Sequence, residues 1–426
     1  MLYSLKIKNF RSIRGELLLD LSTSGRLKSE LNNNILEQNG EQLISTAIIY
    51  GRNASGKSNI LKAFRALEFL VKNSDQFKHD QKLPPYEPFI FERSHQKENI
   101  EFEIVFSGET GIKFNYKIAF NEKTIDYEAL LFYPKGTPAK LFERKNKRVS
   151  YGDYYRGEKK SVEQNLLENQ LFLSKTSNNN IPYLKEAYLF FTSGLTVSTF
   201  HDTEYDETLI RSFSEMMLAD DVTKTNMKYL LCAADTNIKD FTISKNDGRK
   251  FKFPENMPKE VQEEIIERFR YDVKTSHLLF DNGETVGNAY LELEEESLGT
   301  KKLLAIGGLI LSTLKKGGVI VVDELDKSLH PLLTRMLIEL FYSTTNNPNN
   351  AQLIFATHDS SLLDNELFRR DQIYFTDKEY EGNTIFYRLS DLKGVRKNIP
   401  YDKWYLSGRF SAIPIVDDLE LDFTKD

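Results

Sequence analysis

The sequence contains a single cysteine, Cys232, and no long uninterrupted run of hydrophobic residues. One thiol cannot form an intramolecular disulfide or supply a cysteine-based zinc site, so both kinds of framework are excluded. Because its surroundings, "MKYLLCAAD", are typical of an apolar helix, we expect Cys232 to be a buried structural thiol. No segment approaches the ~18 consecutive apolar residues of a membrane-spanning helix, which excludes a span of that kind.

An excess of positive charge is absent as well, since the formal net charge is −6 at pH 7. This balance counts against an extended nucleic-acid surface and leaves only local basic clusters as candidates. Two such clusters, "ERKNKR" at 143–148 and "RGEKK" at 156–160, lie beside turn residues. A solvated hairpin end is the favoured interpretation of each, and a DNA contact is the alternative.

Lysines in "MLYSLKIKNFRSI" occupy the place of a signal peptide's apolar stretch, which predicts a cytoplasmic protein.

The composition that is present is typical of a globular protein, with 40% hydrophobic and 28% charged residues. Residues 1–155 hold β-rich runs separated by turns, which predicts an antiparallel meander following a glycine-rich loop. Residues 156–235 have helical periodicity and are interpreted as an inserted helical subdomain. In residues 236–426 helices alternate with buried strands, which implies a parallel sheet. The expected fold class is therefore α/β, with an antiparallel β subdomain and a helical insertion.

The clearest motif is G-x-x-x-x-G-K-[ST], matched at Gly51, Gly56, Lys57 and Ser58. It lies between the apolar strand "AIIY" and the helix "NILKAFRALEFL", the context of a phosphate-binding loop. Backbone N–H groups and the positive end of the helix dipole would face an anion together. Lys57 would reach the outer phosphates, and Ser58 would coordinate Mg²⁺. The alternative, an unrelated glycine-rich turn before a helix, is disfavoured by this context.

Polar residues follow two further buried strands. Val319 to Val322 lead directly into Asp323 and Glu324, and "QLIFATHD" ends at His358. Because ligands bind at the carboxyl ends of parallel strands, we expect Asp323 to hold Mg²⁺ with Ser58. Glu324 would orient or deprotonate the attacking water, and His358 would contact a γ-phosphate or that water. A solvated acidic turn and a structural histidine are the alternatives.

A second candidate anion site precedes another helix. Ser297, Gly299 and Thr300 in "SLGT" stand immediately before "KKLLAIGGLILSTL". This loop cannot contact a nucleotide from the same side as Lys57. If the loop binds phosphate, we therefore expect a head-to-tail pair of chains. Each chain's loop would then close the nucleotide of the other. An ordinary helix cap is the alternative.

Together these motifs resemble the ABC-type ATPases of the SMC, RecF and OLD-like branch. They are most similar to the predicted ATPases of AAA class fifteen, of the RloA, AbiLi and PARIS type. "IKNFRSI" resembles the opening strand of the branch, "GRNASGKSN" its Walker A, "SLGTKK" a degenerate signature, "VIVVDELDKSLHP" its Walker B with D-loop, and "ATHDSSLL" its switch histidine. "DELDKSLHPLLT", "RRDQIYF" and "YLSGRFSAIP" also resemble family blocks, the last being interpreted as a structural tail.

The resemblance implies an ABC-type core with ATP and Mg²⁺ as cofactors, Glu324 and His358 as catalytic residues, and Ser58 and Asp323 at the metal. The nucleotide contacts that it implies are Arg11, Ser12, Asn53, Ala54, Ser55, Gly56, Lys57, Ser58, Asn59, Ser297, Gly299, Thr300 and Asp326. The signature departs from the LSGGQ form of transporters, and only its location recommends Gln96 as a Q-loop glutamine. SMC relatives insert long coiled coils, whereas no heptad pattern persists here, which predicts a compact body.

The functional expectation is an ATPase whose ATP-bound chains pair as a homodimer or larger homo-oligomer and separate on hydrolysis. The resemblance implies the sensor of a bacterial antiphage (abortive infection) system with a separately encoded effector, a TOPRIM or RloB-like nuclease or a toxin. Residues 359–426 are too few for the TOPRIM domain of OLD-type relatives, and the helical segment 156–235 is assigned to partner docking. The alternatives are a DNA-binding, RecF- or SMC-like repair ATPase and a protein that binds ATP without hydrolysing it. A transporter subunit fits least well.

Overall fold

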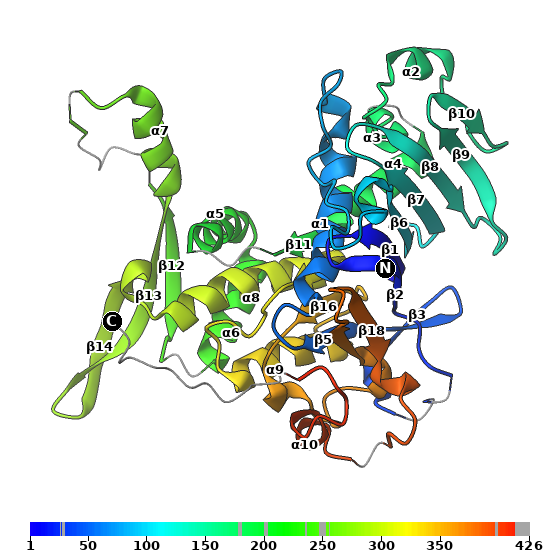
Figure 1. Ribbon diagram of the computed structural model, residues 1–426. Helices are drawn as coiled ribbons and strands as arrows, with labels where there is room; N and C mark the ends of the chain where they lie inside the picture. The colour runs from blue at the N-terminus through cyan, green and yellow to red at the C-terminus, as the bar shows by residue number, and fades with distance from the viewer. Residues whose placement is uncertain are drawn as a thin grey trace, which may run out of the picture.

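The structure, a computed structural model, describes residues 1–25, 27, 30–177, 181–199, 203–234, 237–246, 253–254, 256–396 and 399–413. Two large sheets organise it, one of six strands and one of seven (Figure 1). A three-stranded sheet and a two-stranded hairpin accompany them. Among the described residues, no helix combines the length and apolar character needed to cross a membrane.

The six-stranded sheet carries the expected parallel strands. Its order is β11 (Leu195–Ser198), β15 (Val319–Val322), β16 (Gln352–Ala356), β5 (Thr46–Gly51), β17 (Ile373–Lys378) and β18 (Thr384–Arg388). The first five strands pair in parallel, and β18 pairs antiparallel to β17. Every residue of β5, β15 and β16 is buried, because packed elements cover both faces of the sheet. The predicted mixed α/β fold is confirmed.

The seven-stranded sheet is antiparallel and contains the predicted meander. Its order is β10 (Arg148–Tyr151), β9 (Ala139–Lys145), β8 (Ile125–Phe132), β7 (Lys113–Phe120), β6 (Ile100–Ser107), β1 (Leu2–Phe10) and β2 (Ile13–Asp20). β1 pairs with β6, so the first strand of the chain joins this sheet next to the meander. The basic cluster at 143–148 spans the β9–β10 hairpin end, as the sequence predicted, but Arg144 is buried and not solvated.

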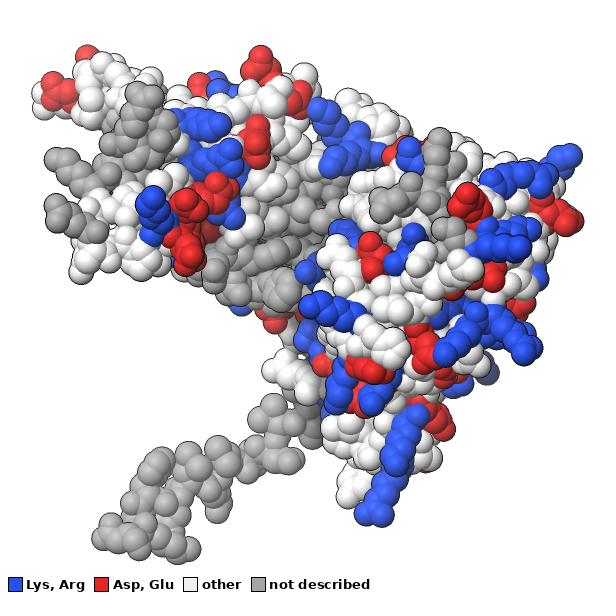
Figure 2. Space-filling model, turned by 90° about the horizontal axis from the view of Figure 1, so that it is seen from above, with Lys and Arg blue, Asp and Glu red and all other residues white. Residues whose placement is uncertain are grey.

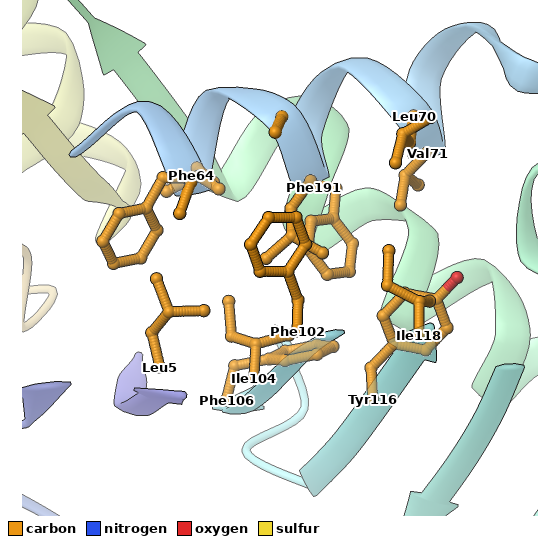
Figure 3. Close-up of a cluster of buried hydrophobic side chains, with 14 of the residues drawn as sticks. Leu5, Phe64, Leu70, Val71, Phe102, Ile104, Phe106, Tyr116, Ile118 and Phe191 are labelled. Atoms are coloured by element: carbon orange, nitrogen blue, oxygen red, sulfur yellow. The ribbon is translucent and has the colours of Figure 1, made fainter. Parts of the chain in front are cut away.

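Helix α1 (Lys57–Asn73) lies between the two sheets. Figure 3 shows Phe64, Leu70 and Val71 of α1 directed at side chains of the antiparallel sheet, among them Phe102 and Ile118. The same hydrophobic core includes buried side chains of β5, β15 and β16. Full burial of each large apolar side chain contributes ~1.5–3 kcal/mol, so packing on both sides fixes the helix that begins at Lys57.

Residues 156–235 differ from the expected helical insertion. The segment contains α2 (Lys160–Asn165), α3 (Phe172–Lys175), α4 (Pro182–Leu189), a π turn (Phe190–Gly194), the strand β11, α5 (Thr203–Ala219) and α6 (Asp221–Ala233). Leu173 and Phe191 belong to the same core as α1, whereas α5 and α6 pack on α8 (Leu298–Lys316). Because β11 is an edge strand of the central sheet, the segment is not a separate helical body.

The remaining elements complete the second core and the periphery. They are β3 (Ile35–Gln38), β4 (Glu41–Ile44), β12 (Asp240–Lys245), α7 (Lys259–Arg268), β13 (Tyr271–Asp281), β14 (Glu284–Glu292), α9 (Pro331–Glu339) and α10 (Tyr401–Leu406). The sheet of β12, β13 and β14 and helix α7 project away from the two large sheets at the left of Figure 1. Tyr405 and Phe410 are buried, which confirms a structural role for the described part of "YLSGRFSAIP".

The prediction that Cys232 is buried was wrong. The face of α6 that packs on the core carries the buried side chains of Met227, Leu230 and Leu231. Cys232, the next residue, lies on the solvent side of the helix. The exposed thiol donates to the carbonyl oxygen of Ile238 at 3.3 Å. The apolar sequence around the cysteine marked the helix correctly but not which face each residue takes.

Candidate nucleotide-binding site

Three neighbouring parallel strands end at one edge of the central sheet. β15 leads into Asp323 and Glu324, β16 leads into Thr357 and His358, and β5 leads into the glycine-rich loop. The adjacency of β15, β16 and β5 brings together residues that are about 300 positions apart in the sequence. The sequence-based expectation that these strand ends converge is confirmed.

The glycine-rich loop approaches its surroundings more closely than a side chain would allow. Gly56, the residue before α1, has φ of 112°, a left-handed conformation that favours glycine. A Cβ atom there would lie 2.1 Å from the Thr384 hydroxyl, and one at Gly51 would lie 2.1 Å from the Thr376 hydroxyl. Ser55 Oγ and Thr376 Oγ1 are 2.5 Å apart. The two glycines therefore let the loop rest directly on β17 and β18.

Lys57 is almost fully buried within this loop. Its Nζ donates to the carbonyl oxygens of Gly51 at 2.7 Å and Arg52 at 3.2 Å. Burial lowers the pKa of Lys57 to about 8, and the nearby carboxylates of Asp323 and Glu324 counteract this effect. The ammonium is thus held by neutral carbonyl groups, which compete only weakly with an anion for its hydrogen bonds. It lies at the start of the helix, where an anion would also meet the helix dipole.

We predict that ATP affinity falls as the pH rises through about 8. Without nucleotide, Lys57 loses its proton near this pH, whereas bound phosphates favour the ammonium and raise its pKa. Binding then takes up a proton, and each further pH unit weakens it by up to about ten-fold. Calorimetric titration from pH about 7 to about 9.5 measures this slope. Lys57→Arg, which stays protonated throughout, is the matched control and should give a flatter profile; a flat wild-type profile contradicts the prediction.

The acidic residues after β15 differ in their environment. Asp323 is buried and its N–H donates to the carbonyl of Ser198 on β11 at 3.0 Å. Glu324 has φ of 46° and a partly exposed carboxylate 3.8 Å from Lys327 Nζ. Asp326 has one buried carboxylate oxygen without a hydrogen-bond partner in the described structure. Hydroxyl and carboxylate oxygens are ligands that Mg²⁺ prefers, so Ser58 and Asp323 suit the metal expected there.

His358 lies close to the same charges. Although its side chain is exposed overall, partial burial and then the Lys57 ammonium lower the pKa of His358. A lowered pKa keeps the ring neutral near pH 7, with one nitrogen able to donate and the other able to accept a hydrogen bond. The imidazole is therefore suited to contacting a phosphate oxygen or a water molecule.

A cavity of about 780 Å³ joins these groups, a volume within the range of small-molecule sites. The sequence-predicted residues that line it are Arg11, Ser12, Asn53, Ala54, Ser55, Gly56, Lys57, Ser58, Asn59, Glu324 and His358. Arg11 forms a bidentate pair with Glu87, at 2.7 and 2.8 Å. Ser12 Oγ contacts Thr384 Oγ1 and accepts from Asn59, both at 2.7 Å. Ser12 thus connects Asn59, near the start of α1, to Thr384 of β18.

Ser297, Gly299 and Thr300 do not line this cavity. Ser297 caps α8 by accepting the N–H of Thr300 at 3.1 Å, so within one chain the helix-cap interpretation describes the geometry. A Cβ atom at Gly299 would lie 3.1 Å from the carbonyl oxygen of Ser328, which places this turn against the segment after Glu324. A contact with the nucleotide of another chain stays a prediction.

Sequence reasoning missed one wall of the cavity. Tyr86, Glu87, Pro88, Ile90, Phe91 and Lys378 line it as well. The available signals were the aromatic stretch "PPYEPFIF" after α1 and the position of Lys378 at the end of β17, beside β5. Gln96 donates from Nε2 to the carbonyl of Ile90 at 2.8 Å. It braces this wall without lining the cavity.

Comparisons with known proteins match most of the chain. A family model described as "AAA domain, putative AbiEii toxin, Type IV TA system" matches residues 47–215 and 227–364. A curated relative, "Retron Vc95 probable ATPase" of Vibrio cholerae serotype O1 biovar El Tor, is 23% identical in an alignment 378 residues long that covers 75% of this chain. The matched region spans 66% of that relative, just under two thirds of its length.

Solved structures with a similar fold include SMC head domains. A head bound to the C-winged helix domain of ScpA gives a TM-score of 0.44 at 14% identity, covering 91% of this chain and 97% of that chain. The SMC head from Thermotoga maritima gives 0.40 at 14% identity, covering 91% and 98%. A head with an extended coiled coil, bound to a ScpA domain, from Pyrococcus furiosus, gives 0.40 at 14% identity, covering 92% and 98%.

Proposed function

Because the chain belongs to the family of AAA domains described as "putative AbiEii toxin, Type IV TA system", we propose that it is a Mg²⁺-dependent ATPase. Its ATP-bound chains pair, and hydrolysis separates them. The observation that carries this proposal is the convergence of the Lys57 loop, Glu324 and His358 on one cavity, with the buried Asp323 carboxylate near enough to act on the pKa of Lys57. Together these groups supply three requirements of phosphoryl transfer: charge stabilisation, metal binding and positioning of water.

The residues divide the work as follows. Lys57 and the backbone N–H groups at the start of α1 hold the outer phosphates, while Ser58 and Asp323 hold the metal. Bound Mg²⁺ would neutralise the negative charge of the phosphates. Glu324 orients the attacking water and accepts its proton, and the neutral imidazole of His358 donates a hydrogen bond to the phosphate that is released.

Pairing of two chains completes the site. The turn formed by Ser297, Gly299 and Thr300 lies outside the cavity of its own chain, and Ser297 and Leu298 are exposed. In a head-to-tail pair this turn closes the cavity of the partner, so that the N-terminus of α8 faces the bound phosphates. The pair is then stable only while nucleotide links its two halves, which couples hydrolysis to separation.

The function of this cycle is to control a separately encoded effector, a nuclease or toxin, in a bacterial defence system. The names of the matched family and of the retron relative support this assignment, as does the resemblance to RloA- and AbiLi-type ATPases. Exposed Val222 and Tyr229 on α6 and Leu218 on α5 are suited to docking that partner. On the face seen in Figure 2, Lys and Arg are interspersed with Asp and Glu, and together with the net charge of −6 this favours a protein partner over a long DNA contact.

We predict that the purified chain alone releases phosphate from ATP in the presence of Mg²⁺ and leaves DNA, RNA and tRNA intact. Co-purified with the product of a neighbouring gene, it should restrain or release cleavage or toxicity according to the nucleotide supplied. Phosphate release and gel-based cleavage assays on the same preparations measure both properties. Cleavage by the single chain, abolished by a substitution within that chain, would refute the two-component proposal.

A further inference from the structure

One wall of the cavity is unusually apolar. The segment from Tyr86 to Phe91 turns Phe89 into the interior, where it is fully buried, and leaves Ile90 and Phe91 each 61% exposed. Both exposed side chains line the same cavity as Lys57. Two adjacent large hydrophobic side chains facing an otherwise polar nucleotide pocket provide a surface for an apolar or aromatic ligand group.

This wall is held in place by buried polar contacts. Asn9, fully buried at the end of β1 with φ of 54°, accepts the N–H of Phe89 at 3.2 Å. Its amide nitrogen donates to the carbonyls of His95 at 2.9 Å and Glu98 at 3.1 Å. The Phe89 ring also contacts the His95 ring edge-on, with the ring centroids 6.2 Å apart. The exposed pair is therefore presented on a fixed backbone, which lowers the entropic cost of ligand binding.

The Phe91 ring has a defined neighbourhood of its own. A Cβ atom at Gly382 would lie 2.8 Å from Phe91 Cδ2, so the ring rests against the β17–β18 turn. Lys378 Nζ lies 5.6 Å from the ring centroid, within the range of a cation–π contact. The ring is thus supported by β17 and β18, the strands on which the glycine-rich loop also rests.

The polarity of the cavity gives the direction of a bound nucleotide. Lys57 and the start of α1 suit the phosphates, so the base extends toward the remaining lining residues. We propose that Ile90 and Phe91 form a stacking platform for the nucleobase, with Lys378 beside it. This inference rests on the proposed nucleotide-binding function. Because every base has a π-face, a platform of this kind binds adenine and guanine nucleotides with similar affinity.

We predict that Phe91→Ala weakens ATP binding roughly ten-fold, as expected for the loss of one base–aromatic stack, without weakening the binding of inorganic tripolyphosphate. Tripolyphosphate carries the charges that Lys57 binds but has no base. Calorimetric titration of both ligands with Mg²⁺ measures the two affinities, and retained tripolyphosphate binding shows that the variant is folded. Phe280→Ala is the matched control, since Phe280 is 59% exposed on β13, outside the cavity.

The outcomes separate the platform from the nucleotide site itself. Lys57→Ala should weaken both ligands, and a wild-type chain that binds neither would overturn the proposed function. If Phe91→Ala binds ATP as the Phe280→Ala control does, or loses ATP and tripolyphosphate to the same extent, the platform is wrong. Phe91→Tyr, which keeps the aromatic face, should restore most of the ATP affinity. A strong preference for ATP over GTP would contradict recognition by stacking.

Discussion

Glu324→Gln is expected to slow ATP hydrolysis by ~10²-fold or more while ATP binding is retained. The amide has nearly the shape of the carboxylate but cannot accept a proton from water. Glu324 follows the buried strand β15 with a left-handed backbone, φ of 46°, and lines the cavity that also contains Lys57 and His358. A left-handed conformation costs free energy for a residue other than glycine, so contacts with the surrounding structure must hold it in place. These contacts direct the Glu324 side chain into the cavity.

Phosphate release with Mg²⁺ and ATP measures the rate, and light scattering in the same buffer measures the mass of the particles. With hydrolysis blocked, the ATP-bound pair should accumulate and the mass should rise toward that of two chains. Glu284→Gln, at an exposed carboxylate on β14, is the matched control and should behave like the wild type. Equal hydrolysis by the wild type and Glu324→Gln would remove Glu324 from its catalytic role.

Mixing two inactive variants is expected to restore hydrolysis. Lys57→Ala impairs the phosphate loop, and Gly299→Asp puts a carboxylate into the turn that would face the partner's phosphates in the proposed pair, so neither chain should hydrolyse well alone. A mixed pair has one site with both intact halves and one with neither. With random pairing, about a quarter of the wild-type activity should return.

A second mixture distinguishes complementation in trans from any general effect of mixing. Lys57 and Glu324 serve the same cavity of the same chain, so Lys57→Ala mixed with Glu324→Gln leaves every site with one defect and should stay inactive. Phosphate release by the two mixtures is compared after subunit exchange has been demonstrated with labelled chains. Equal activity of the two mixtures would exclude the shared site.

The sequence by itself determined the parts of the site that depend on short-range order. The strand, turn and helix around Lys57 follow from a few consecutive residues, because a strand, a glycine-rich turn and a helix start must occur in that order to make an anion site. Val319 to Val322 followed by Asp323 and Glu324 indicated a buried strand with carboxylates at its end. General rules of parallel sheets then placed His358 at the same edge, and the structure confirmed that placement.

Only the tertiary structure decided which residues far apart in the sequence share a surface. The strand β11 is four residues long inside a helical region, and its pairing with β15 makes it part of the central sheet. Cys232 lies on the outer side of its helix because its neighbours fill the core, a choice that the apolar composition does not encode. The wall formed by Ile90, Phe91 and Lys378 depends on pairing of β17 with β5 and on Asn9 holding a distant loop. Such contacts follow from packing of the whole chain. The exposure of each residue depends on neighbours that are distant in the sequence, and a local sequence pattern does not identify them.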